Sequence, residues 1–522
     1  MAYKHGVYIQ EQATSLLSPV QVESAIPFVV GTAPVNMCAA ASVNTPVLCT
    51  TWAEAVAAFG YCPPVEEDGV KQHAFTLCEF MKSHFALYGV APVVLVNVLD
   101  PEEHAQDESD DLELSPKCVS VIRRQGILPD SVEIAKTTTV TTPAQGGGEP
   151  EVETTTVTYE AEEDYVLSFD GDGYLVVTGT QTGGTYNLPT SLINTVDDVT
   201  GVSTAETLTI SYSWLDPSGV GAEDITGSED EGGNRTGLML AEDVFPRLRV
   251  TPGIIAAPGY SQIPAVAAEM AARARSINGL FSAIAVADIP SGESAADSYA
   301  DAPAWKNDNN YASPWLIACW PKLSLDGVQY WMSTHLASLM AQVDGDNSDV
   351  PYVSPSNKNF QCTASVLEDG TEVWLNTDSA NYLNGNGIVT ALNFVGGWKC
   401  WGNRTSCYPA VTDVKDSFIP LRRMFSWIGN SLVQTYWQRV DFPLTRRQVQ
   451  AIVDSVNIWL NGLAARQYIL GGRLEFLESE NPATSLMDGV ATFHLYMTPP
   501  SPNREIEFTL EYDVSYLETL FG

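Results

Sequence analysis

The sequence FIPLRRMFSWIGNSL, residues 418–432, decides how the C-terminal part of this chain folds. Its apolar side chains recur at spacings of four and three residues, at Leu421, Phe425, Ile428 and Leu432. This period predicts an amphipathic helix, and a second apolar stripe follows the Phe442-Pro443 break, from 449 to 463. Paired glycines at 471 and 472 end the helical pattern, and two short runs, 473–477 and 490–497, have strand character.

A run of alternating residues follows the prolines at 499, 500 and 502. Its apolar members are Ile506, Phe508, Leu510, Tyr512 and Val514, and acidic or hydroxyl side chains separate them. Alternation with a period of two predicts a β-strand over 505–514. No hairpin partner lies beside it in the sequence, so we expect this C-terminal arm, residues 500–522, to pair with a neighbouring chain.

A second strand without a mate is expected at the other end of the chain. Residues 3–11 carry apolar side chains at Val7 and Ile9, and a Leu-Leu-Ser-Pro sequence follows at 16–19 in place of a turn. One loose terminus means little, because termini are often poorly anchored. Two such strands at opposite ends indicate that the N-terminal arm, residues 1–20, and the C-terminal arm are connectors between subunits.

The C-terminal region also departs from the charge of the whole chain, which is −38. From Lys415 to Arg473 there are eight basic and three acidic residues, a net charge of +5. This surface is a candidate for docking an acidic partner, and the ordinary alternative is a solvated helix face. The candidate contact residues are Arg422, Arg423, Arg439, Arg446 and Arg447. The first two could instead pair with carboxylates inside the subunit.

The rest of the chain reads as a mixed α/β protein with one insertion. Buried-strand runs alternate with helical segments over 21–111 and again over 238–415, which favours a partly parallel sheet covered on both faces. Between them, residues 100–235 hold 28 acidic and five basic residues, or −23 of the total charge. We therefore expect an acidic β-rich domain at 112–237, and a helix pair with a small sheet at 416–499.

No motif with catalytic or cofactor-binding chemistry stands out. Glycine-rich phosphate loops, His-Glu-x-x-His, Gly-x-Ser-x-Gly and Cys-x-x-Cys are all missing from the sequence. A run at 344–355 starts like a calcium loop but has Asp349 at the sixth position and Pro355 at the twelfth. We expect no catalytic residue, cofactor or metal, although an α/β hydrolase with a spatially assembled triad stays an open alternative.

The composition excludes several classes of partner. The strong acidity argues against nucleic acid, and no apolar run reaches the ~18 residues that a membrane span needs. The first residues lack the apolar core of a secretion signal, so we expect assembly in the cytoplasm of the producing cell. Nine cysteines without a repeated spacing fit reduced thiols.

Several segments, taken in their order along the chain, resemble the contractile phage tail sheath proteins. They are YKHGVY at 3–8, PFVVGTAP at 27–34, RVTPGIIAAPG at 249–259 and VPYVSPSNK at 350–358. In the C-terminal part the resemblance rests on Arg422, Arg423, Ser431, Trp437, Phe442, Pro443, Gly471, Asn481 and Gly489. It covers roughly 1–100 and 238–522, and the insertion lies outside it.

The resemblance implies a structural subunit of stacked rings, six subunits to a ring, around a tail tube. It implies that the C-terminal helices face the tube, that the insertion faces outward, and that both arms add strands to a neighbour's small sheet. The partners would be the tube, baseplate and tail terminator proteins of a virion. The sheath of an R-type bacteriocin or of a type VI-like injection system is the alternative machine. Contraction would draw on energy stored in a metastable assembly, since no nucleotide site is visible.

Overall fold

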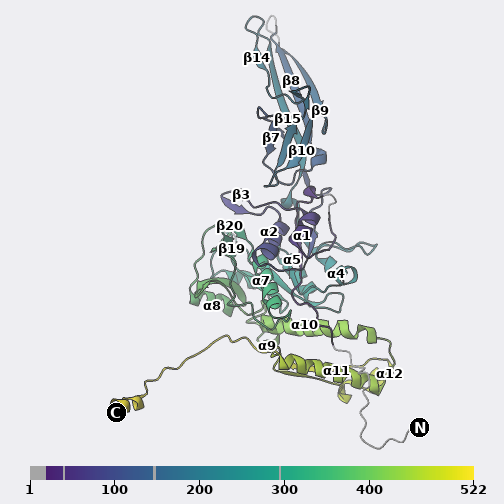
Figure 1. The fold of residues 1–522 in the computed structure, drawn as a ribbon, viewed down its shortest axis with the longest axis vertical. Coiled ribbons are helices and arrows are strands. Elements are labelled where there is room, and N and C mark those ends of the chain that lie inside the picture. The colour runs from purple at the N-terminus through teal and green to yellow at the C-terminus, as the bar shows by residue number, and fades with distance from the viewer. Residues whose placement is uncertain (1–18, 39–41, 145–148, 293–294, 522) are drawn as a thin grey trace, which may run out of the picture.

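The computed structural model describes residues 19–38, 42–144, 149–292 and 295–521 (Figure 1). Its centre is an eight-stranded sheet with the order β2-β5-β1-β16-β17-β18-β22-β23, in which the six inner strands are parallel. The inner strands are β1 (Pro27–Gly31), β5 (Val93–Asn97), β16 (Ile254–Ala256), β17 (Ile284–Asp288), β18 (Leu316–Cys319) and β22 (Ile388–Phe394). The antiparallel edge strands are β2 (Val47–Cys49) and β23 (Gly397–Trp401).

Strands β1, β5 and β17 are buried at every position, as expected for continuous apolar runs covered on both faces. The covering helices are α1 (Trp52–Phe59), α2 (Thr76–Met81) with a π-helical extension (Lys82–Leu87), α3 (Ala222–Thr226), α4 (Ala241–Leu248), α5 (Pro264–Arg275), α6 (Ala302–Asp308), α7 (Met332–Asp346) and α8 (Thr377–Gly385). A second sheet has the order β21-β19-β20-β4-β3. Its strands are β21 (Ala364–Val366), β19 (Lys322–Leu325), β20 (Val328–Tyr330), β4 (Val70–Gln72) and β3 (Val65–Glu67). The predicted α/β class is confirmed.

The acidic insertion forms a separate β-structure at one end of the long axis (Figure 1). Its larger sheet contains β14 (Asn194–Val196), β15 (Ser203–Leu215), β8 (Glu133–Thr142), β9 (Glu151–Tyr159) and β6 (Ala105–Asp111). Its smaller sheets contain β10 (Tyr165–Phe169), β11 (Leu175–Gly179) and β7 (Val119–Ile122), and the pair β12 (Gln181–Thr182) and β13 (Thr185–Tyr186). Twelve buried residues between Leu112 and Tyr212 form a hydrophobic core of its own.

The structure draws the limits of this domain differently from the sequence, which placed them at 112 and 237. Strand β6 pairs with β15 from Ala105↔Leu215 onward, so the domain starts about seven residues earlier. After Leu215 the chain returns to the main core, where Val220 and Ile225 are buried. The sequence boundaries followed the acidic charge, but side-chain packing decides which residues belong to which core.

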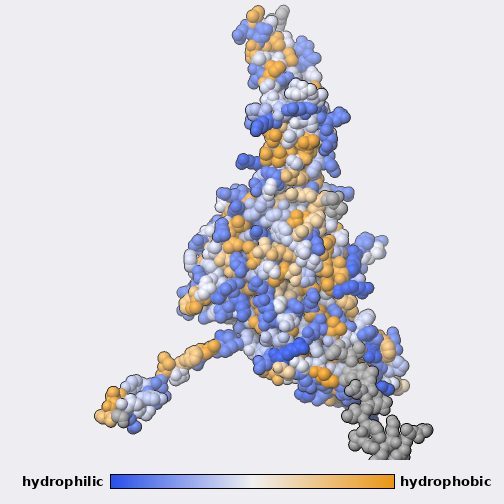
Figure 2. Space-filling view, viewed as in Figure 1, coloured by the Kyte–Doolittle hydropathy of each residue, from blue (hydrophilic) through white to orange (hydrophobic). Residues whose placement is uncertain are grey.

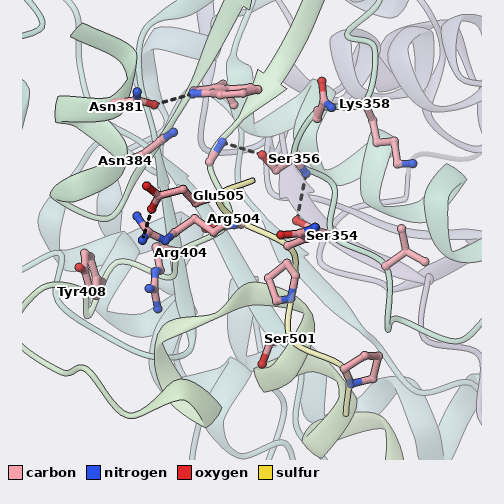
Figure 3. A pocket seen from close by; sticks show the side chains of 18 of the residues that line it. Ser354, Ser356, Lys358, Asn381, Asn384, Arg404, Tyr408, Ser501, Arg504 and Glu505 are labelled. Atoms are coloured by element: carbon pink, nitrogen blue, oxygen red, sulfur yellow. Dashed lines mark hydrogen bonds and ion pairs between the residues drawn. The ribbon is translucent and has the colours of Figure 1, made fainter. Parts of the chain in front are cut away.

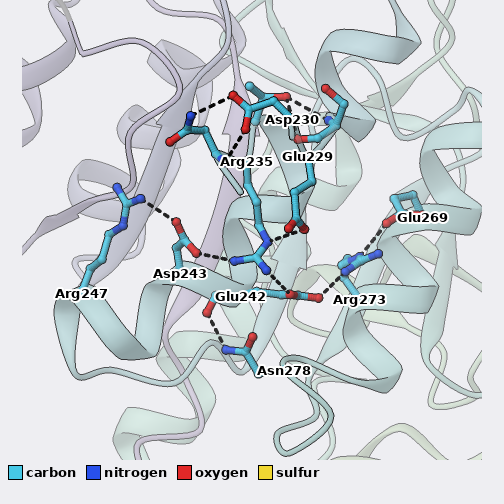
Figure 4. Close-up of polar contacts among 12 residues, drawn as sticks. Glu229, Asp230, Arg235, Glu242, Asp243, Arg247, Glu269, Arg273 and Asn278 are labelled. Atoms are coloured by element: carbon cyan, nitrogen blue, oxygen red, sulfur yellow. Dashed lines mark hydrogen bonds and ion pairs between the residues drawn. The ribbon is translucent and has the colours of Figure 1, made fainter. Parts of the chain in front are cut away.

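An ion-pair network fixes the segment after the insertion to the core (Figure 4). The guanidinium of Arg235 contacts carboxylates of Glu229, Glu242 and Asp243 at 3.1, 3.3 and 2.8 Å. On the other side of Glu242, Arg273 of α5 contacts the same carboxylate at 2.5 Å. Because α4 supplies the central acids, residues 229–235 are attached to the helices of the core rather than to the insertion.

The C-terminal elements lie at the end of the molecule opposite the insertion (Figure 1). They are α9 (Val414–Ser417), α10 (Ile419–Tyr436), α11 (Arg446–Ala465), β24 (Gly471–Glu475), α12 (Ala483–Met487) and β25 (His494–Thr498). The two predicted helices and two predicted strands are therefore present. A third core, which includes Trp427, Ile428, Trp459 and Leu460, joins the two helices to the β24–β25 sheet.

The strand expected at 505–514 is not formed in the isolated chain. Residues 499–513 have no regular secondary structure, and a 3₁₀-helix (Val514–Phe521) follows. The alternating pattern predicted which side chains would share a face, but a strand exists only when a second strand supplies hydrogen-bond partners.

Candidate assembly interface

An extended segment at the start of the described chain lies along helix α10. The amide of Val20 donates to Oγ1 of Thr435 at 2.8 Å, and the amide of Val22 donates to Oγ of Ser431 at 3.4 Å. The indole Nε1 of Trp427 donates to the carbonyl of Val22 at 2.7 Å. The helix residues are four apart and share one face, and alternate residues of the extended segment point at them. The described segment from Val20 onward therefore follows one face of α10, with Val20 near the last turn of that helix.

Arg423 occupies the next position of the same stripe. Its Nη1 donates to Oδ1 of Asp344 at 2.9 Å, and its Nη2 donates to the other carboxylate oxygen and to the carbonyl of Ser24 at 3.3 Å. Arg423 is 4% exposed and Asp344 is fully buried. The hypothesis that Arg423 faces a partner is therefore wrong, and the alternative of an internal ion pair holds.

Arg422 is also engaged inside the subunit. Its Nη1 contacts Oδ1 of Asp416 at 2.9 Å, and its guanidinium lies 4.1 Å from the ring centroid of Trp315. Only 12% of its side chain is exposed. The sequence could not distinguish these two arginines from the others, because net charge says nothing about which carboxylates the fold brings near.

The other three candidate arginines lie where α10 turns into α11. Arg439 is half-buried, and Arg446 and Arg447 are exposed in the first turn of α11. In the described part of the chain, none of the three makes an ion pair, whereas Arg422 and Arg423 do. These residues remain candidates for a partner contact.

One edge of the small C-terminal sheet is closed by a side chain of α11. The Nδ2 of Asn457 donates to the carbonyl of Leu474 at 3.1 Å, and the amide of Leu474 donates to Oδ1 of Asn457 at 2.7 Å. Leu474 in β24 lies opposite Leu495 in β25. Both backbone groups of Leu474 point away from β25, so in this antiparallel pair the groups of Leu495 point away from β24. Within the described ranges no strand pairs with the outer edge of β25, which we call its open edge.

The C-terminal arm presents apolar side chains to solvent (Figure 2). Phe508 is 85% exposed and Leu510 is 94% exposed, and the three other apolar members of the alternating run are at least 65% exposed. The arm projects away from the body of the subunit (Figure 1). Large apolar side chains are rarely left in such a row on a soluble protein unless a partner covers them.

The base of the arm crosses a groove of about 750 Å³ (Figure 3). On its wall the guanidinium of Arg404 stacks 3.6 Å from the ring centroid of Phe418 and 4.4 Å from that of Tyr408, and donates to Oγ of Ser417 at 2.7 Å. Burial lowers the pKa of Arg404, and neighbouring Arg504 adds to this. The base of the arm thus lies near Phe418 at the start of α10, whereas Val20 contacts Thr435 near the end of that helix.

The N-terminal candidates Val7 and Ile9 lie outside the described residues. Their pairing with a neighbour stays a prediction.

Sequence comparison detects relatives over the full length of the chain. It is 26% identical to the tail sheath protein of Burkholderia phage BcepMu over 529 aligned positions, which cover 100% of this chain and 99% of the relative. It is 26% identical to the tail sheath protein of Escherichia phage P2, over 57% of this chain and 72% of the relative. No family model matches.

The chain is similar along its whole length to a phage tail sheath protein, which supports the resemblance to the contractile tail sheath family. Solved structures of contractile sheaths agree with this similarity at the level of the fold. The sheath of an extracellular contractile injection system, PVC, in the contracted state has a TM-score of 0.54 at 12% identity, with 99% of both chains covered. The contracted helical sheath of the anti-feeding prophage has a TM-score of 0.53 at 14% identity, covering 98% of this chain.

Among the described residues, buried polar side chains lie at the carboxyl ends of the central strands. Asp288, at the end of β17, accepts from the amide of Ser333 at 2.9 Å and from Oγ of Ser261 at 3.0 Å. Burial raises the pKa of Asp288 to about 6 and that of Glu79, which accepts from the amide of Trp331 at 2.8 Å, to about 7. These carboxylates hold the first turn of α7 against the sheet.

One group of side chains in the described ranges has the composition of a metal site, namely Glu103, His104 and Asp224. The Nδ1 of His104 accepts from the amide of Asp100 at 3.0 Å, so the ring hydrogen is on Nε2, 3.6 Å from the carboxylate of Asp224. A neutral imidazole ligates a metal through an unprotonated nitrogen, and here neither nitrogen is free. The group therefore fits an internal contact at the base of the insertion. None of the helices in the described ranges combines the length and hydropathy of a membrane span.

Two features of the interface were missed by sequence reasoning. Asn457 closes one sheet edge, and Ser431 and Thr435 bind the extended N-terminal segment. Polar residues inside a predicted helix carry no signal that tells which distant backbone they will reach. The four-residue spacing of 423, 427, 431 and 435 was the only available hint.

Proposed function

We propose that copies of this chain polymerise around a tail tube in stacked rings of six. Strands that each subunit donates to its neighbours would link the rings. The assembled sheath would then shorten and drive the tube through a bacterial envelope. The observation that carries the proposal is a pair of complementary features in one subunit. Its C-terminal arm exposes apolar side chains and has no backbone pairing among the described residues, and the open edge of its strand β25 lies at Leu495. We propose that the arm of one subunit pairs with the β25 edge of the next.

The arm can complete the neighbour's sheet on both faces. Leu474 and Leu495 point inward to the third core, while His494 and Tyr496 lie on the outer face with their rings stacked at 4.2 Å. A docked strand would extend the inner face with Phe508 and its apolar neighbours and leave the acidic side chains outside. The alternation that predicted the strand therefore matches the two faces of the β24–β25 sheet, one apolar and one polar.

The energy of a single link is small. A docked arm adds about five backbone hydrogen bonds at about 1 kcal/mol each, while ordering it costs about 1–2 kcal/mol per residue. Burial of the apolar side chains adds to the favourable side. Linkage becomes strong when each subunit holds several neighbours at once, as it does in a closed mesh. The N-terminal arm, with Val7 and Ile9, would supply the second set of links.

The edge pairing is tested by comparing Leu495→Pro with Leu495→Ala. Both variants lose the packing of the leucine side chain, but only proline removes the outward amide hydrogen, which the β24–β25 ladder does not use. Both monomers should fold with similar unfolding midpoints in urea. Sedimentation and electron microscopy should then show tubes for Leu495→Ala and none, or far shorter ones, for Leu495→Pro.

Equal assembly of the two variants would mean that the open edge is not the docking site. Loss of folding in Leu495→Pro alone would mean that the amide serves the subunit's own sheet. Hydrogen exchange of residues 493–498 in monomer and polymer separates these cases, because docking should protect the amides of 495 and 497 only in the polymer.

The two ends of the subunit suggest its orientation. The acidic insertion lies at one end of the long axis (Figure 1). The helix pair lies at the other end, and its Arg439, Arg446 and Arg447 make no ion pair with any described residue. We propose that the helix pair faces the tube and the insertion faces outward. Baseplate and terminator proteins would close the two ends of a sheath assembled in the producing cell's cytoplasm, and the chain would act as a structural protein without catalysis or cofactor.

A phage tail is favoured over a bacteriocin or another injection system. A relative that matches the full length of the chain, insertion included, is a phage tail sheath protein. The injection-system sheaths are similar in fold at 12–14% identity, which does not distinguish the machines.

A further inference from the structure

The tip of the α10–α11 hairpin exposes apolar side chains among its arginines. We name residues 436–447 the hairpin tip. Trp437 is 61% exposed, Val440 63%, Phe442 55% and Leu444 43%. The same tip carries three arginines and one aspartate between 437 and 447, a net charge of +2 in a chain of −38. A surface that only needed to be soluble or positively charged would not place four large apolar side chains within eight residues.

A socket opens between the two helices beside these side chains. It measures about 220 Å³ and is lined by Tyr436, Arg439, Phe442, Thr445, Arg447, Gln448, Ala451, Ile452 and Ser455. The hydroxyl of Tyr436 is buried beside Ser455, and it makes no hydrogen bond of normal geometry among the described residues. A buried hydroxyl without a partner costs free energy, so such a group is commonly completed by a ligand. Arg439 and Arg447 line the same socket, so the group that fits it is an anion with acceptor oxygens.

We infer that the hairpin tip binds its partner by inserting apolar side chains and by forming one buried ionic contact. The matching partner surface is an apolar depression with a projecting carboxylate side chain. Trp437 and Phe442 would enter the depression, and the carboxylate would enter the socket between Arg439 and Arg447, accepting from the Tyr436 hydroxyl. The inference rests on the proposed function, in which the partner is the outer surface of the tail tube.

This contact differs in a measurable way from a purely electrostatic one. Exposed ion pairs weaken strongly as salt rises, whereas burial of aromatic side chains does not. Binding should therefore fall with salt to a plateau rather than to zero. Arginine, tryptophan and tyrosine are also the residues that most often dominate the binding energy of an interface.

The test uses full-length chain and tail tubes stripped of sheath from intact particles. Trp437→Ala and Phe442→Ala should each weaken co-sedimentation with tubes by about tenfold or more, as expected for central interface residues. Tyr436→Phe removes only the hydroxyl and should weaken binding severalfold, while the monomer keeps or gains stability because an unpartnered polar group is lost. Ile458→Ala, an exposed apolar position on α11 outside the tip, is the matched control and should not change tube binding.

Footprinting of residues 437–444 decides which surface covers the tip. The segment should be accessible in the monomer, stay accessible in polymers formed without tubes, and become protected on tubes. Protection in tube-free polymers would assign the tip to a contact between copies of the chain. Protection in the monomer that vanishes when residues 1–18 are deleted would assign it to the chain's own N-terminus. Either result overturns the inference.

The proposed function and this inference fail separately. A wild-type chain that forms no polymer under any condition contradicts the proposed function. A chain that polymerises normally, with tip variants that bind tubes like wild type, contradicts only the inference.

Discussion

The insertion and the C-terminal region occupy opposite ends of the subunit. They differ in how far their strands are paired and their apolar side chains are buried within the subunit. The insertion pairs its strands internally and encloses its own hydrophobic core. The C-terminal region has a two-stranded sheet with an open edge, an arm with exposed apolar side chains and a hairpin tip with a socket of about 220 Å³. A part of a subunit that satisfies its own backbone can stand at the periphery of an assembly. We expect a part that does not to be completed by other chains, and assembly to be controlled there.

The largest expected effect follows from removing the unsatisfied arm. Truncation after Pro499 should abolish polymerisation, because every link that the arm makes to a neighbour is lost at once. The unfolding midpoint of the monomer should stay within the error of the measurement, since residues 505–513 form no secondary structure within the subunit. Electron microscopy and chemical denaturation provide the two readouts. Ordered tubes from the truncated chain would show that the arm is dispensable.

The second effect concerns the buried ion pair that holds the N-terminal segment on α10. Arg423→Met leaves the carboxylate of Asp344 buried without its main partner, which typically costs about 3–5 kcal/mol. The free energy of unfolding from urea titration should fall by that order, whereas the exposed Arg466→Met should change it little. A double variant, Arg423→Met with Asp344→Leu, should recover most of the loss. A small effect of the single variant would mean that water solvates the pair.

The third effect is the pH dependence of stability, which arises from buried titratable side chains of the central core. Burial lowers the pKa of His84 to about 3 and those of His73 and His335 to about 4 and 3. The unfolded chain takes up protons near pH 6.5 while the folded histidines do not, so these groups cost stability as pH falls from about 6.5 toward 3–4. Glu79 and Asp288 have raised pKa values and act in the opposite direction. Their contribution to the free energy of unfolding falls as the pH rises toward 7 for Glu79 and toward 6 for Asp288.

His84→Phe isolates one of these contributions. The ring of His84 stacks on Phe80 with centroids 5.5 Å apart, and neither ring nitrogen makes a hydrogen bond of normal geometry among the described residues, although the backbone of Pro92 lies beside the ring. The variant should gain stability relative to wild type as pH is lowered from 7.5 to 5, because it has no proton to take up on unfolding. A difference in unfolding free energy that is constant over this pH range would contradict the lowered pKa.

The smallest effect is expected from removing the self-sufficient end. Ala105 and Leu215 are opposite each other across the β6–β15 ladder, so their Cα atoms are about 5 Å apart and a linker of about three Gly or Ser residues can join them. Deleting 106–214 should leave a soluble core with native circular dichroism that still forms tubes. An unfolded remainder would show that the insertion contributes to the core, for example through Gln125, which donates to the carbonyl of Pro63 at 3.0 Å.

The sequence alone determined those features that depend on local pattern. The period of 418–432, the β-branched run at 93–97 and the alternation of 505–514 predicted a helix, a buried strand and a two-faced strand segment. The order of its motifs also indicated the sheath family. These predictions depend only on which residues share a face, and spacing fixes that.

The tertiary structure decided the different roles of residues that look alike in the sequence. Five arginines looked alike in the sequence, but the fold brings Asp344 and Asp416 to two of them and leaves three at the hairpin tip. Asn457, a helix residue that reaches a backbone 17 positions away, closes the outer edge of β24, so the other edge of the sheet belongs to β25. Contacts between residues distant in the chain follow from packing, which no local pattern encodes. Whether residues 505–514 become a strand depends on a partner outside the subunit, because the backbone of a strand must find its hydrogen bonds elsewhere.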